Sequence, residues 1–160
     1  MSPPWGAAPR ARSFGSMRTA RIIYRYLTAI FLADVLLQFF LAGAGVFSAG
    51  PGTAARDSAA LDPHRTNGSI VMLLGLLLLI AALAARNGRW KLALPLFLLT
   101  LLQPVLAIAG AAGGLHVLGA VAILGLGSLL TVQAWRSGRV SEPVTPEETQ
   151  PVASRRGPAG

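Results

Sequence analysis

The sequence predicts an all-α fold, a four-helix transmembrane bundle that runs up-down-up-down and is built from two repeated helical hairpins. Hydrophobic residues make up 53% of the chain and charged residues 12%, which is unlike the composition of a soluble globular domain. Four apolar stretches are at least about 17 residues long, which is the lower limit for a spanning helix. None of them alternates as the strands of a membrane barrel do.

The predicted spans are residues 22–46, 69–85, 92–108 and 115–135. They fall within a single transmembrane domain, 21–136. Residues 1–20 are expected to form a disordered basic cytoplasmic segment and residues 137–160 a disordered cytoplasmic tail, because both lack apolar periodicity. Before the second span, Asp62 is expected to cap a helix whose first residue is Pro63.

An internal repeat supports the two-hairpin interpretation. The segment 36–45 (LLQFFLAGAG) returns as 101–110 (LLQPVLAIAG), so that Gln38 and Gln103 correspond at an offset of 65 residues (103 − 38 = 65). One histidine follows each copy, His64 and then His116, and each precedes another apolar run. Each hairpin therefore carries one glutamine within its first helix and one histidine at the start of its second.

Charge placement predicts the orientation. Basic residues lie before the first span, between the second and third, and after the fourth, so the positive-inside rule places both termini in the cytoplasm. Topology therefore accounts for the net charge of +8, and no nucleic-acid partner is expected. The lipid bilayer is the expected environment. Lysine is rare in the chain, whereas arginine, alanine and glycine are abundant. This composition points to a GC-rich bacterial genome, and we therefore expect a multi-pass protein of the bacterial plasma membrane.

The two histidines are the strongest candidates for a binding site. Placed on diagonally opposed helices of a bundle, His64 and His116 fit the two axial ligands of a b-type haem iron. Arg65 could pair with a haem propionate, and Gln38 and Gln103 could line a polar cofactor. The alternatives are an outer-face ligand such as a quinone, or histidines with a structural or pH-sensitive role. The chain has no cysteine, which excludes thiolate chemistry and covalent haem attachment through cysteine.

Asp34 is the one acidic residue inside a predicted span. An ionisable group in hydrocarbon is a functional candidate by default, and Gln38 lies four residues further along the same helix face. We expect Asp34 to be protonated or hydrogen-bonded there. It is either a proton-accessible acid or a hydrogen-bond partner between helices, and the matching position of the repeat holds Leu99 instead.

These motifs resemble a family of small four-span bacterial membrane proteins of unknown function. The resemblance covers about residues 18–136 and rests on the Gln38 segment, on Asp62-Pro63-His64-Arg65-x-x-Gly68, on Gln103 and on Leu115-His116. The chain is more loosely similar to one half of haem A synthase and to transmembrane b-type cytochromes, which also place histidines in a four-helix bundle. The synthase follows its glutamine with a polar, arginine-bearing segment, whereas residues 41–45 are apolar here, which speaks against synthase activity.

Three functions remain open on the sequence. The first is binding of b-type haem between His64 and His116, with or without electron transfer. The second is a non-catalytic subunit or assembly factor of a larger membrane complex, with a membrane-protein partner or a homo-oligomer. The third is a small proton-handling or transport protein that uses Asp34 and Gln38. No motif identifies a reaction, and a hydrolytic enzyme is not expected.

Overall fold

The computed structural model describes residues 12–49, 59–86, 88–109 and 113–139, and within these ranges it contains helices and no strand. The long helices are α1 (Arg12–Ser48), α2 (Asp62–Ala84), α3 (Trp90–Ile108) and α4 (Gly113–Arg139), and the short 3-10 helix η2 (Ala59–Leu61) precedes α2. All four long helices contain a stretch long and apolar enough to cross a membrane. The predicted all-α class is therefore confirmed. Residues 1–11, 50–58, 87, 110–112 and 140–160 lie outside the described ranges, and so do most of the two segments that were expected to be disordered.

Two helix starts differ from the sequence-based expectation. Helix α1 begins at Arg12, well before the predicted apolar span 22–46, and no proline lies between Pro9 and Pro51 to interrupt it. The prediction that Asp62 caps α2 is wrong. Leu61 occupies the N-cap position, where no side-chain capping hydrogen bond is made, and Asp62 is the first helical residue. The carboxylate of Asp62 instead pairs with Arg65 one turn later, at 2.5 Å.

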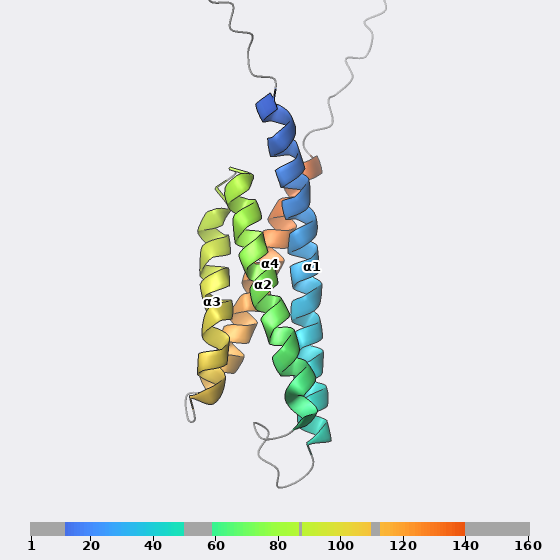
Figure 1. Ribbon diagram of the computed structural model, residues 1–160, viewed down its shortest axis with the longest axis vertical. Helices are drawn as coiled ribbons and strands as arrows, with labels where there is room; N and C mark the ends of the chain where they lie inside the picture. Colours follow the sequence, from blue (N-terminus) through green and yellow to red (C-terminus); the bar gives the residue numbers. More distant parts are fainter. Residues whose placement is uncertain (1–11, 50–58, 87, 110–112, 140–160) are drawn as a thin grey trace, which may run out of the picture.

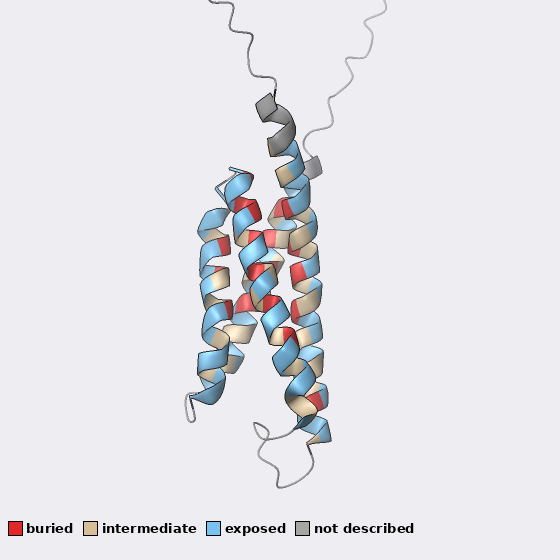
Figure 2. Cartoon of the chain, viewed as in Figure 1, coloured by how far each residue is buried: buried red, intermediate tan, exposed pale blue. Residues whose placement is uncertain are grey.

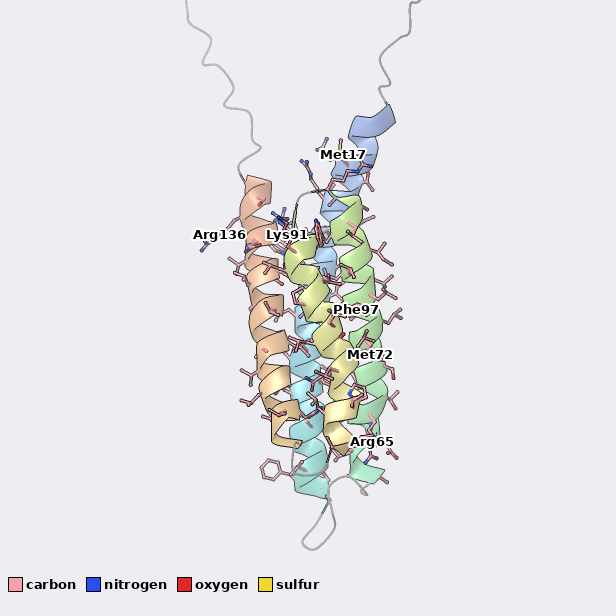
Figure 3. All side chains as sticks on the ribbon, turned by 90° about the vertical axis from the view of Figure 1, so that its left-hand side faces the viewer. Met17, Arg65, Met72, Lys91, Phe97 and Arg136 are labelled. Atoms are coloured by element: carbon pink, nitrogen blue, oxygen red, sulfur yellow. The ribbon has the colours of Figure 1, made fainter. Side chains whose placement is uncertain are left out.

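The helices form a four-cornered bundle in which successive helices run in opposite directions (Figure 1). α1 packs on α2 and α4, and α3 packs on the same two helices, so α2 and α4 are diagonally opposed. One end of the bundle holds the start of α1, the α2–α3 turn and the end of α4, and we call it the basic end because Lys91 and Arg136 lie there (Figure 3). We call the opposite end, where α2 and α4 begin with His64 and His116, the histidine end.

Large apolar side chains cover much of the outside of the bundle. Phe40, Ile108 and Leu118 are 68%, 80% and 65% exposed, and Figure 2 shows exposed residues along the outer faces of the helices. An apolar surface of this extent is unusual on a soluble monomer. It is the surface that contact with lipid acyl chains requires.

The centre of the core is built around Phe31 of α1, which is fully buried. Cβ atoms built on Gly75 of α2 and Gly127 of α4 would lie 3.7 and 3.2 Å from its ring. The ring therefore fills the space between two helices that do not pack directly on each other. Close to this level, the hydroxyl of Thr131 in α4 lies 3.1 Å from the carbonyl oxygen of Thr28 in α1, which adds a polar link between these helices.

Truncating this ring tests the packing. Phe31→Ala removes the ring and leaves a cavity between α1, α2 and α4, and we expect the free energy of unfolding to fall by about 3 kcal/mol. Reversible unfolding in mixed detergent micelles measures the change. Phe40→Ala is the control, because the Phe40 ring faces outward and its loss leaves no internal cavity. Equal losses from the two variants would contradict the assigned core.

Candidate functional site

A hydrogen-bonded group joins the first hairpin at the histidine end. The side-chain amide of Gln38 in α1 donates to the carbonyl oxygen of His64 in α2, at 2.9 Å. Asn67, one turn after His64, donates to Oε1 of Gln38, also at 2.9 Å. In return, Nδ1 of His64 lies 3.2 Å from the main-chain oxygen of Gln38. α1 and α2 are thus tied together by polar contacts in both directions.

The second hairpin repeats the central contact of the first. Nδ1 of His116 in α4 lies 3.1 Å from the main-chain oxygen of Gln103 in α3. In both hairpins, therefore, the histidine contacts the backbone of the repeated glutamine. The sequence repeat corresponds to a repeated hydrogen bond.

These contacts determine which nitrogen of each imidazole carries the proton. A carbonyl oxygen can only accept, so the Nδ1 atoms of His64 and His116 must donate. In the neutral ring, the lone pair is then on Nε2. This is the tautomer in which histidines commonly bind metals through Nε2. In His64, the Nε2 atom lies 3.5 Å from the side-chain amide of Gln38.

The structure also brings the two histidines together. The centres of the His64 and His116 rings are 6.3 Å apart, and the ring planes are inclined by 78°. Both residues are half-buried. Toward this end the α1–α2 and α3–α4 pairs draw apart (Figure 1), and the two rings bridge the pairs from their diagonal helices.

The two halves of the site differ at one helix turn beyond each histidine. Asn67 stands three residues after His64 and gives Gln38 a partner, whereas Gly119 stands three residues after His116. The side chain of Gln103 lies directly against Gly119, where a Cβ atom would collide with its Nε2. Both polar atoms of the Gln103 side chain are buried and have no partner within the described residues. The second half therefore presents an unsatisfied amide beside His116.

Asn67 is a site residue that the sequence analysis missed. It is only 7% exposed, and it connects to Gln38 from the adjacent helix. The sequence feature that could have identified Asn67 is its position one turn after His64, on the same face of the helix. Without the register of α1 against α2, that position could not be distinguished from an ordinary polar residue at a membrane surface.

Asp34 and Arg65 occupy different surroundings. Asp34 lies one turn before Gln38 in α1, is half-buried, and has a buried Oδ2 atom with no hydrogen-bond partner among the described residues. Arg65 lies beside His64 but its side chain is exposed and ion-paired with Asp62. The described part of the chain contains no group of three or more histidine, cysteine, aspartate or glutamate side chains that could hold a metal ion.

Comparison with known proteins gives one match. A family model described as a family of unknown function (DUF6220) matches residues 38–112, somewhat less than half of the 160-residue chain. The matched segment begins at Gln38 and includes His64, Asn67 and Gln103, and it ends before His116. No curated protein matches the chain, and no solved structure does.

The role of Asn67 can be tested by removing its amide. Asn67→Ala leaves Oε1 of Gln38 without its donor inside the bundle, and we expect a loss of about 1 kcal/mol in unfolding free energy. Unfolding in mixed micelles measures it. Ser69→Ala is the control, because Ser69 is exposed on the same helix. A loss no larger than that of the control would contradict the assigned hydrogen bond.

Proposed function

We propose that this protein binds a b-type haem between His64 and His116 at the histidine end of the bundle. The observation that carries the proposal is the pair of imidazoles, each held through Nδ1 by a main-chain oxygen, with 6.3 Å between the ring centres. A metal ion held linearly by two imidazoles, about 2 Å from each nitrogen, separates the ring centres by about 6 Å. The observed spacing fits such an ion.

The number of ligands favours an iron porphyrin over a bare metal ion. A closed zinc site needs four protein ligands, and within the described residues only two candidate ligands meet. A porphyrin supplies the remaining in-plane ligands itself. When bound, a haem would supply one-electron chemistry to the protein.

The surrounding residues have roles that follow from their contacts. The main-chain oxygens of Gln38 and Gln103 would orient the two histidines and make Nε2 a better donor to iron. The side-chain amide of Gln38 lies 3.5 Å from Nε2 of His64, and it would have to move away for this nitrogen to bind iron. The buried amide of Gln103 would gain a partner in a polar substituent or a bound water. Arg65 would provide positive charge for a carboxylate at the membrane surface.

Spectroscopy tests this proposal. The full chain, produced with haem supplied and purified in mild detergent, is expected to show a Soret band and a low-spin bis-histidine signal in electron paramagnetic resonance. Both signals should be lost in His64→Ala and in His116→Ala, because each variant removes one axial ligand. Thr66→Ala is the control, because Thr66 is an exposed neighbour of His64. A wild-type protein without a Soret band, or bands retained in both histidine variants, would refute the proposal.

Proton handling is a second candidate, favoured by the buried and unpartnered Oδ2 of Asp34. A carboxyl group at this depth can exchange a proton when water reaches it. Asn67 hydrogen-bonds both Asp34 and Gln38, and Gln38 donates to the carbonyl oxygen of His64. These polar residues lead from the interior of the bundle to the histidine end.

Proton uptake into vesicles tests this candidate. Proteoliposomes that contain a pH-sensitive dye are expected to acidify under an inside-negative potential, and Asp34→Asn should abolish that uptake without lowering stability. Asp62→Asn is the control because it removes an exposed carboxylate at the start of α2. Equal uptake by wild type and Asp34→Asn would rule out this use of Asp34.

A further inference from the structure

The basic end of the bundle contains a concentration of positively charged residues. The cationic residues described there come from α1, α3, α4 and the α2–α3 turn, and they are Arg18, Arg21, Arg25, Arg86, Arg89, Lys91 and Arg136. The acidic residues in the described ranges are Asp34, within α1, and Asp62, at the opposite end. This charge is therefore balanced by no carboxylate in the part of the chain that the structure describes.

Two hollows meet at Arg136 on the surface of α4. One has a volume of about 480 Å³ and is lined by Gly88, Arg89, Leu92, Gln133, Arg136 and Ser137. The other, of about 440 Å³, is lined by Ala29, Thr131, Val132, Trp135 and Arg136. We call the first the polar hollow, because four of its six lining residues are polar or cationic. We call the second the apolar hollow, because three of its five lining residues are apolar, and it reaches two residues further along α4, to Thr131.

The walls of these hollows are held in place by specific contacts. Arg89 donates to the carbonyl oxygen of Gln133, at 3.0 Å, and to the hydroxyl of Ser137, which ties the start of α3 to the end of α4. The guanidinium carbon of Arg25 lies 3.7 Å from the centre of the Trp135 ring, an arrangement typical of a cation–π contact. Arg136, by contrast, is exposed and makes no hydrogen bond or ion pair with the described residues.

From this arrangement we infer a binding site for an anionic phospholipid at the basic end. The phosphate lies in the polar hollow between Arg136 and Arg89, and an acyl chain lies along the apolar hollow beside Ala29 and Val132. Charge complementarity selects an anionic headgroup, since basic pockets between membrane helices bind such lipids. The apolar hollow distinguishes a lipid from a free phosphate ion. This inference does not depend on the haem proposal, because the two sites lie at opposite ends of the bundle.

Lipid titration of the full chain in detergent tests the site by native mass spectrometry. We expect phosphatidylglycerol to bind in preference to phosphatidylcholine, and Arg136→Gln to weaken phosphatidylglycerol binding about fivefold. Arg18→Gln is the matched control, because it removes one exposed charge at the same end but lines neither hollow. Equal losses in the two variants, or equal binding of the two lipids, would overturn the inference.

A second variant separates the two parts of the ligand. Ala29→Leu fills the apolar hollow at the surface of the bundle and should weaken phosphatidylglycerol binding while leaving all charges in place. Inorganic phosphate, followed by thermal shift, should stabilise the protein less than the lipid does. If Ala29→Leu bound the lipid as wild type does, or if phosphate alone matched the lipid, the phospholipid site would be wrong.

Discussion

Hydrocarbon offers no hydrogen-bond partner, so a polar side chain within this bundle is stabilised only by other groups of the protein or by water that enters with it. That constraint organises the histidine end. The amide of Gln38 is satisfied by α2 through His64 and Asn67, and the Nδ1 atom of each histidine lies against the main chain of the preceding helix. The helices of each hairpin are thereby fixed in register, and both imidazoles are directed to the same region.

Both hairpins have the contact between the histidine and the glutamine main chain, but their other polar side chains differ in hydrogen bonding. In the first, Asp34, Gln38 and Asn67 form a polar group between α1 and α2. In the second, Leu99 and Gly119 occupy the corresponding places, and the amide of Gln103 has no hydrogen-bond partner among the described residues. The contact between the histidine and the main chain of the glutamine is present in both hairpins, whereas the supporting polar residues are present in one. The histidine contact is therefore the structural element that the two copies share.

The sequence was sufficient to predict the four helices, because long apolar runs have few alternative folds. It also predicted that α2 and α4 lie diagonally and that each carries a histidine near its start. It did not predict the beginning of α1 or the role of Asp62, since both depend on local competition among backbone and side-chain partners. Asn67 was missed because its importance comes from facing Gln38, and that pairing is set by how α1 and α2 pack. The buried state of the Gln103 amide likewise depends on the contact between α3 and α4 at Gly119.

The position of Phe31 has a mechanical consequence. Its ring packs between glycines of α2 and α4, and the Thr131–Thr28 contact close by links α1 to α4. Beyond it the hairpins draw apart, and the rings of His64 and His116 still lie 6.3 Å apart between their centres. Phe31 therefore joins α1, α2 and α4 at one level of the bundle, and the imidazole pair brings α2 and α4 together a second time nearer the histidine end.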